Sequence, residues 1–298
     1  MQTCSCNRSA TILASKKRNL LLYPLAVLYR AAYVIHHQLC LRPGRPTSHA
    51  QVVIVGAYRN GGAGKTPFCI WLANKLCDQG KKVAVLCHAA AKDEAELLKN
   101  KLPRCTVLAT RNRYTAAHKL DPDFDIILCD DGFEDSRLQF AKAICLEWGD
   151  EPQGIADLFP AGRARSLAQD HKNIALRLNC AGATPDVYFC IQQIRNIQDH
   201  APGAPATLVA GIGDPKRFFG DMERTGLQIQ KSIALRDHDT GIENIVSKLL
   251  AEGHNVITTE KDACRLSPNS AANAKLFVAV QTVNVTPEAE ARIMALLR

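Results

Sequence analysis

A glycine-rich stretch combines the residue types that bind nucleotide phosphates: Gly61-Gly62-Ala63-Gly64-Lys65-Thr66. Glycines allow consecutive backbone N–H groups to point at a phosphate, and the N-terminus of a following helix adds partial positive charge. Lys65 can reach the β- and γ-phosphates, and the Thr66 hydroxyl can bind Mg²⁺. Arg59 occupies the position where the usual motif has its first glycine. The remaining match still predicts an ATP-binding loop.

A pair of carboxylates forms the second candidate for phosphate chemistry. Asp130 and Asp131 follow the apolar run Asp125–Cys129. In P-loop enzymes, a carboxylate at the end of a buried strand holds Mg²⁺ or its water shell. Asp130 is the expected Mg²⁺ ligand, with Asp131 close by. Because Asp-Asp-Gly is also a common turn, the pair gains its meaning from the phosphate loop upstream. The two motifs together predict ATP and Mg²⁺ as cofactors.

The phosphate loop lies between two elements that would present it to a ligand. Gln51–Val55 is a short β-branched run typical of a buried strand, and Thr66–Gln79 has helical periodicity. Strand-like and helical runs then alternate along the chain: Lys82–Cys87, Glu94–Lys101, Thr106–Ala109, Tyr114–Leu120, Asp125–Cys129 and Ala143–Leu146. This alternation predicts an α/β fold, a P-loop NTPase-like domain whose parallel sheet has helices on both faces.

A second, smaller α/β unit is predicted downstream. Its expected elements are strands at Thr207–Ala210 and Asn255–Thr258 and helices at Met222–Thr225 and Ile242–Ala251. Two β-rich runs flank it and could pair as a two-stranded connector, before a last helix returns to the first domain: Phe189–Ile197, Leu276–Val285 and Pro287–Leu297. We therefore expect four parts: residues 1–46 (basic segment and helix), 47–200 (P-loop domain), 201–275 (smaller domain) and 276–298 (connector strand and helix).

The N-terminal region carries a basic cluster, Arg8 and Lys16–Arg18, followed by the apolar run Leu20–Ile35. The run is interrupted by Arg30, and a spanning helix needs about 20 apolar residues, so we do not expect it to cross a membrane. From Pro24 onward, apolar residues share one helical face: Leu25, Leu28, Ala32 and Ile35. This pattern suits a helix lying in the membrane interface. A helix packed on the protein's own core is the alternative.

The composition favours anionic partners. The chain has 37 Lys and Arg against 29 Asp and Glu, a net charge of +8. Because base-stacking aromatics on a basic surface are lacking, no nucleic-acid partner is expected. The 12 cysteines are scattered through apolar runs, and Cys4 and Cys6 lack the further ligands of a zinc site, which indicates a reducing cytoplasm. No pattern indicates an oligomeric state.

These motifs and several others, in the order in which they occur along the chain, resemble those of the tetraacyldisaccharide 4′-kinase family. The resemblance extends from about residue 20 to the C-terminus. The phosphate loop and Asp130-Asp131-Gly132-Phe133 are similar to that family's displaced-glycine loop and Asp-Asp-Gly motif. Four downstream stretches also match: Pro160-Ala161-Gly162-Arg163-Ala164-Arg165, Ala210–Phe219, Asp237-His238 and Thr258–Ala263. The second and fourth are far more specific than the loop.

The resemblance implies transfer of the ATP γ-phosphate to the 4′-hydroxyl of a tetraacylated glucosamine disaccharide 1-phosphate in lipid A biosynthesis. It also implies an anionic lipid substrate at the cytoplasmic face of the bacterial inner membrane. In this family an acidic residue of an Asp-Glu pair, assisted by a His, activates the sugar hydroxyl. The matching residues are Asp93-Glu94 and His238. Lys65 is expected to act in catalysis, and Glu94 and Arg165 to contact the substrate.

The same residues allow simpler interpretations. Asp93 and Glu94 could be the acidic first turn of a helix, which the helix dipole favours. His238 could be a loop histidine, and Arg165 a solvated cation. The family's glycine- and tyrosine-containing segment is also replaced here by Leu86–Lys92. Two other functions therefore remain as hypotheses: a catalytically impaired homologue that binds nucleotide and lipid, and a P-loop NTPase with another substrate.

Overall fold

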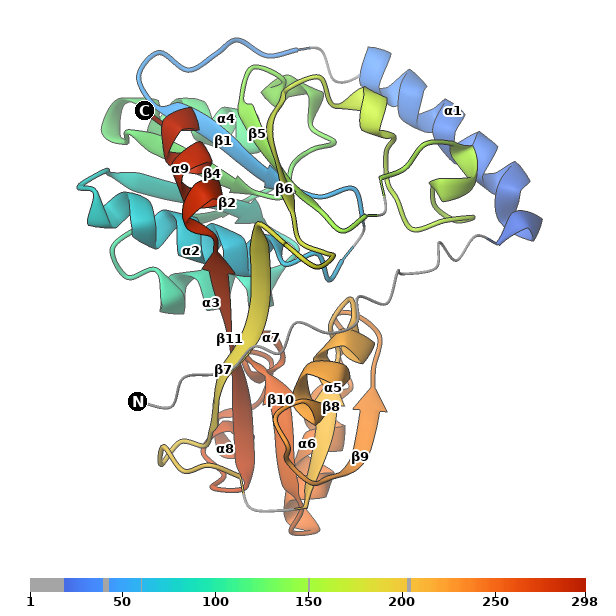
Figure 1. Ribbon diagram of the computed structural model, residues 1–298, viewed down its shortest axis with the longest axis vertical. Helices are drawn as coiled ribbons and strands as arrows, with labels where there is room; N and C mark the ends of the chain where they lie inside the picture. The colour runs from blue at the N-terminus through green and yellow to red at the C-terminus, as the bar shows by residue number, and fades with distance from the viewer. Residues whose placement is uncertain (1–18, 40–42, 60, 150, 203–204) are drawn as a thin grey trace.

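The computed structural model describes residues 19–39, 43–59, 61–149, 151–202 and 205–298. Cys4, Cys6 and the basic cluster at Arg8 and Lys16–Arg18 lie outside the described residues. The described chain forms two sheets with their helices, one above the other in the view of Figure 1. We call them the first sheet and the second sheet.

The first sheet has six parallel strands in the order β3-β2-β4-β1-β5-β6. Their bounds are β1 (Gln51–Gly56), β2 (Val83–His88), β3 (Thr106–Thr110), β4 (Ile126–Asp130), β5 (Lys142–Glu147) and β6 (Ile174–Asn179). The parallel sheet predicted from alternating strands and helices is confirmed. Strand β6 was not predicted, because as a partly exposed edge strand it mixes polar and apolar residues.

Helices cover both faces of the first sheet. On one face lie α2 (Lys65–Asp78), α3 (Lys92–Lys101) and α9 (Pro287–Leu296), whose buried residues form one core with Val53 and Val55. On the other face, α4 (Arg113–Leu120) packs with Val52 and Ile54. Successive residues of β1 therefore point into opposite cores, as the period of a strand requires. The last helix, α9, thus packs against the first sheet.

The second sheet has five strands in the order β7-β11-β10-β8-β9. Their bounds are β7 (Val187–Arg195), β8 (Ala206–Ala210), β9 (Ile229–Ala234), β10 (Asn255–Thr259) and β11 (Leu276–Val285). The predicted pairing of the two flanking runs is confirmed: β7 and β11 are antiparallel, with Val187 opposite Val285. The other neighbours are parallel, so the sheet is mixed. The edge strand β9 was not predicted.

Helices α5 (Pro215–Glu223) and α6 (Ile242–Ala251) pack on opposite faces of the second sheet. The short helices α7 (Glu260–Ala263) and α8 (Pro268–Ala271) follow β10. The helix predicted at Met222–Thr225 begins earlier than expected. Asp214 caps its N-terminus by accepting a hydrogen bond from the Arg217 N–H, and Pro215 occupies the first turn, which favours a helix start there.

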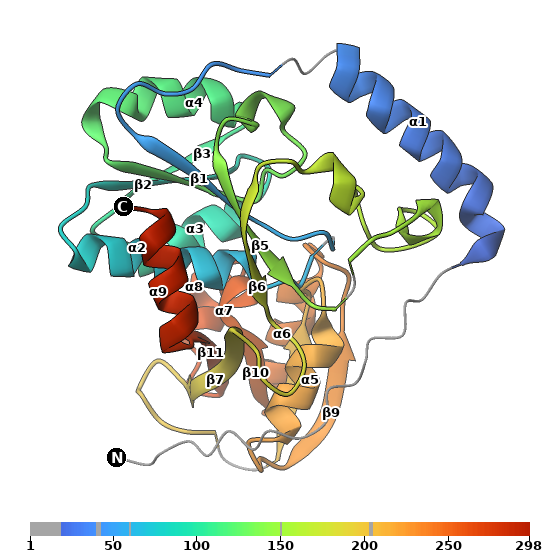
Figure 2. The ribbon, with the colours of Figure 1, turned by 45° about the horizontal axis from the view of Figure 1, so that its top comes forward.

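Helix α1 (Tyr23–Leu39) follows a short 3₁₀ turn and runs along the outside of the first sheet's domain, clearest in Figure 2. One face packs on the protein: Ala26 is fully buried, the Tyr29 hydroxyl donates to the Arg165 carbonyl at 2.8 Å, and Arg30 forms an ion pair with Asp170. The predicted apolar stripe, Leu25, Leu28, Ala32 and Ile35, is exposed. Among the described residues, no helix has both the length and the apolar character needed to span a bilayer.

Candidate active site

The phosphate loop connects β1 to α2 and depends on glycine for its shape. Gly61, Gly62 and Gly64 have φ angles of 73°, 64° and 79°, in the left-handed region where side chains with a Cβ are strained. Gly64 is the N-cap residue of α2, so the helix begins at Lys65. The loop therefore presents the positive end of the α2 dipole toward whatever lies in front of it.

The loop opens into a cleft of about 940 Å³ lined by residues from both sheets. The structure brings most of the predicted site residues to this cleft: Gly61, Gly62, Ala63, Gly64, Lys65, Thr66, Glu94, Asp130, Asp131, Arg165 and His238. Residues of β7 and β11 line it as well, among them Ile191 and Thr282. A cleft of this volume can hold a nucleotide-sized ligand.

Asp131 is bound by two cations. Lys65 Nζ lies 3.2 Å and Arg165 Nη2 lies 2.7 Å from its Oδ2 atom, and Arg165 Nε also lies 3.3 Å from Glu134. Burial alone would raise the pKa of Asp131, but Lys65 and Arg165 hold it well below its usual range. Asp131 is therefore an anion that positions Lys65 and Arg165 at the mouth of the phosphate loop.

Asp130, at the end of β4, has a different environment. It is 3% exposed, and its carboxylate accepts no hydrogen bond from any described residue within normal geometry. Burial and the nearby Glu94 raise its pKa to about 7, which the Thr66 hydroxyl only partly offsets. A buried carboxylate without a donor is unusual in a folded protein. Its oxygens next to a threonine hydroxyl match the hard ligands that Mg²⁺ prefers, so the residues present fit that cation.

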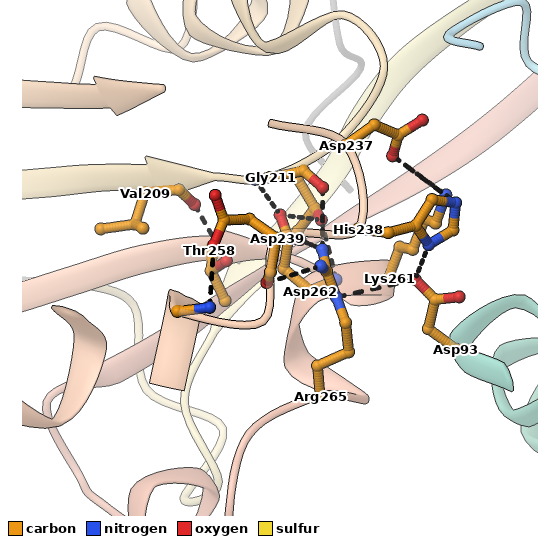
Figure 3. Close-up of polar contacts among 12 residues, drawn as sticks. Asp93, Val209, Gly211, Asp237, His238, Asp239, Thr258, Lys261, Asp262 and Arg265 are labelled. Atoms are coloured by element: carbon orange, nitrogen blue, oxygen red, sulfur yellow. Dashed lines mark hydrogen bonds and ion pairs between the residues drawn. The ribbon is translucent and has the colours of Figure 1, made fainter. Parts of the chain in front are cut away.

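Asp93 and His238 come together from the domains of the two sheets. Asp93 lies in the first turn of α3, and His238 lies in the turn after β9. The Nδ1 atom of His238 is 3.1 Å from Oδ2 of Asp93, across 145 residues of sequence (Figure 3). The Asp93 side chain is 4% exposed and that of His238 is 45% exposed. A buried carboxylate behind an accessible imidazole is an arrangement suited to accepting a proton.

The turn that carries His238 is strained. His238 has a φ of 58°, unusual for a residue with a side chain, and its backbone N–H donates to the Gly211 carbonyl at 3.3 Å. Strain of this kind persists only where surrounding contacts hold it. Asp93 is thus both the acidic first-turn residue of a helix and the partner of His238, so the two interpretations of this residue are compatible.

Glu94, the neighbour of Asp93, pairs with a lysine from the second sheet. Lys261 Nζ donates to Glu94 Oε1 at 2.9 Å and lies 3.4 Å from Asp237. Although burial opposes it, Glu94 and Asp237 raise the pKa of Lys261, which stays protonated. This pair places a further cation at the cleft, beside His238.

Arg217 is a contact of the phosphate loop that the sequence patterns did not reveal. Its Nη1 atom donates to the Gly62 carbonyl at 2.8 Å, and Trp148 Nε1 donates to the Ala63 carbonyl at 3.1 Å. A Cβ at Gly213 would lie 2.8 Å from the Gly62 nitrogen, so only glycine allows this approach. Arg217 and Gly213 both lie in the Ala210–Phe219 stretch, which indicated the family but not the contact.

Comparison with known proteins agrees with these observations. The sequence model of the tetraacyldisaccharide-1-P 4′-kinase family matches residues 18–89 and 87–298. A tetraacyldisaccharide 4′-kinase from Verminephrobacter eiseniae is 31% identical over 292 residues, covering 83% of this chain and 66% of the relative. One from Chlamydia trachomatis is 27% identical over 291 residues, covering 81% and 78%.

A solved structure shares the fold. The crystal structure of the “apo” form of LpxK from Aquifex aeolicus in complex with ATP has a TM-score of 0.67 to this chain and 19% sequence identity. The match covers 93% of this chain and 98% of that one. Because the family model spans almost all of the sequence, the chain belongs to the tetraacyldisaccharide-1-phosphate 4′-kinase family.

Proposed function

We propose that this chain transfers the γ-phosphate of ATP to the 4′-hydroxyl of a tetraacylated glucosamine disaccharide 1-phosphate, as in its family. One observation carries the proposal. The phosphate loop, on the first sheet, and His238, which pairs with Asp93 across the two sheets, line one cleft. Phosphoryl transfer needs a bound nucleotide and an acceptor hydroxyl side by side, and this cleft provides groups suited to each.

The phosphate loop would hold the nucleotide. Backbone N–H groups of Gly61–Thr66 and the N-terminus of α2 face the phosphates, and Lys65 exchanges part of its contact with Asp131 for the γ-phosphate. Asp130 and Thr66 are the residues that would hold Mg²⁺, which supplies charge neutralisation when bound. Arg165, kept in place by Asp131, adds positive charge near the transferred group.

The Asp93–His238 pair would accept the proton of the acceptor hydroxyl. His238 is the member that reaches the cleft, and Asp93 lies behind it on Nδ1. A carboxylate in that position orients the imidazole and stabilises it when it gains a proton. Glu94 and Lys261 flank the pair and provide polar groups for the sugar and its charged substituent.

The exposed stripe on α1 supports association with a membrane surface. Leu25, Leu28 and Ile35 are between 52% and 65% exposed on a helix whose opposite face packs on the protein. An apolar helical face of this kind inserts into the headgroup region of a bilayer, and a net charge of +8 favours anionic lipids. We therefore propose a peripheral location at the cytoplasmic face of the inner membrane, where an acylated substrate resides.

The test is direct phosphate transfer. The purified chain, with Mg²⁺ and labelled ATP, should phosphorylate tetraacyldisaccharide 1-phosphate in mixed micelles. Asp93→Asn should lower kcat about 10²-fold or more while ATP still binds, since general base catalysis contributes about 10²–10⁴-fold. Asp123→Asn, at an exposed aspartate outside the cleft, is the control. ATP binding without lipid phosphorylation by the wild type would favour the impaired homologue. Transfer of the γ-phosphate to water or to an acceptor other than the lipid would favour a P-loop NTPase with another substrate.

A further inference from the structure

Arg265 is a partly buried cation behind the Asp93–His238 pair, and the reaction described above does not use its contacts. It follows α7, and its side chain is 15% exposed. It forms an ion pair with Asp262 and donates to two carbonyl oxygens, those of Gly211 at 2.8 Å and Asp239 at 3.2 Å (Figure 3). Gly211 accepts the backbone N–H of His238, and Asp239 is the residue after it. Arg265 therefore holds the strained turn at two points around His238.

The fourth contact of Arg265 is with Asp93, which belongs to the first sheet's domain. Its Nε atom lies 3.6 Å from Oδ2 of Asp93 and, although buried, has no hydrogen-bond partner among the described residues. The same Asp93 oxygen faces Nδ1 of His238. One carboxylate oxygen of Asp93 is therefore placed between an imidazole and a guanidinium.

Asp262 fixes where Arg265 lies. It is fully buried, accepts the Gly211 N–H at 3.0 Å and the Thr259 hydroxyl at 2.9 Å, and so has partners of its own besides Arg265. The anchor is thus built into the end of β10 and the start of α7. An arginine needed only to pair with Asp262 would have no reason to extend to Asp93.

The other groups around Asp93 do not provide the same contact. His238 shares the oxygen, and Glu94 follows in the chain. Lys261, from α7, donates a hydrogen bond to Glu94 at 2.9 Å. The Cys264 thiol stays protonated because burial raises its pKa to about 11. Arg265 is the cation within 4 Å of the Asp93 carboxylate among the ion pairs of the described residues.

We infer that Arg265 is a positioning residue for the Asp93–His238 pair. It holds the His238 turn through the Gly211 and Asp239 carbonyls, and its guanidinium lies against the Asp93 oxygen that faces the imidazole. The inference rests on the proposed role of that pair in accepting the hydroxyl proton.

The experiment compares Arg265→Gln and Arg265→Lys with the wild type in the lipid phosphorylation assay. Arg265→Gln should lower kcat about tenfold or more with the KM for ATP within about twofold, because only proton acceptance is impaired. Arg265→Lys keeps the charge and should lie between, about two- to fivefold below the wild type in kcat.

Arg224→Gln is the matched control. Arg224 forms the same (i, i+3) pair with an aspartate, Asp221, on the second sheet's domain, but it is exposed and its pair lies away from Asp93. A lower melting temperature in Arg265→Gln with kcat and the KM for ATP both unchanged would overturn the inference and leave a structural role. If Arg265→Gln does not fold, Arg265→Lys is the deciding variant, and a kcat equal to that of the wild type overturns the inference.

Asp93→Asn, measured in parallel, separates this inference from the proposed function. If Asp93→Asn keeps the kcat of the wild type, the proposed role of the Asp93–His238 pair is wrong, and this conclusion does not depend on the Arg265 variants. If Asp93→Asn is inactive and the Arg265 variants behave like the wild type, only the role of Arg265 fails.

Discussion

Arg217 Nη1, on α5 beside the second sheet, donates a hydrogen bond of 2.8 Å to the carbonyl oxygen of Gly62 in the phosphate loop of the first. Its guanidinium lies over the rings of Trp148 and Phe189, at 4.9 Å and 5.5 Å from their centroids. A carbonyl held from outside leaves the neighbouring N–H groups free to face the cleft. The shape of the phosphate loop is therefore set in part by the second sheet's domain.

Loss of this contact should weaken ATP binding. We expect Arg217→Met to raise the KM for ATP about tenfold with a smaller effect on kcat, because a hydrogen bond from a charged donor contributes about 1.5–3 kcal/mol. Calorimetric titration with ATP measures the accompanying change in the Kd for ATP. Arg195→Met is the control, since Arg195 on β7 pairs only locally, with Asp199 at 3.1 Å. Equal ATP affinities for all three proteins would mean that Arg217 does not shape the loop.

His171 should make the protein less stable in acid. It is packed against Tyr58 and Phe133, and burial lowers its pKa from 6.5 to about 4. The unfolded chain therefore gains a proton at a higher pH than the folded one, so the stability present above the unfolded pKa is lost as pH falls toward the folded value. The loss amounts to at most about 3 kcal/mol in the free energy of unfolding.

His171→Gln removes this titration. Urea denaturation between about pH 4 and pH 7 should show a shallower loss of stability for the variant than for the wild type. His200→Gln, at an exposed histidine, should keep the slope of the wild type. If the His171 variant loses stability in acid as steeply as the wild type, other groups cause the loss.

Membrane binding by the exposed face of α1 can be tested by introducing a single negative charge. Leu28 is 65% exposed, and Leu28→Glu should reduce partitioning onto anionic vesicles about tenfold or more, because burying a leucine contributes about 1.5–3 kcal/mol. Vesicle flotation is the measurement. Ile197, on the second sheet's side of the molecule, is 66% exposed, so Ile197→Glu is a closely matched control. Equal partitioning of both variants and the wild type would remove α1 from the membrane surface.

Local patterns in the sequence were sufficient to predict most elements of the fold. β1 and β4 are buried on both faces and appear as continuous apolar runs, and α2 begins where the glycine loop ends. The edge strands β6 and β9 were missed, because a half-exposed strand needs no such run. The start of α5 at Pro215 was missed too, although its aspartate cap and proline are visible in the sequence.

The candidate site divides in the same way. The phosphate loop and Asp130 could be predicted together, because β1 and β4 are adjacent parallel strands, with Val55 opposite Asp130, and strands of one direction end at one edge. The sequence by itself thus determined the side of the cleft that the phosphate loop and Asp130 form. The pairing of Asp93 with His238, the reach of Arg265 to Asp93 and the hold of Arg217 on Gly62 were decided only by the tertiary structure. Each of these three contacts joins the domains of the two sheets. The relative placement of the two domains depends on packing between residues far apart in the sequence, which no local pattern encodes.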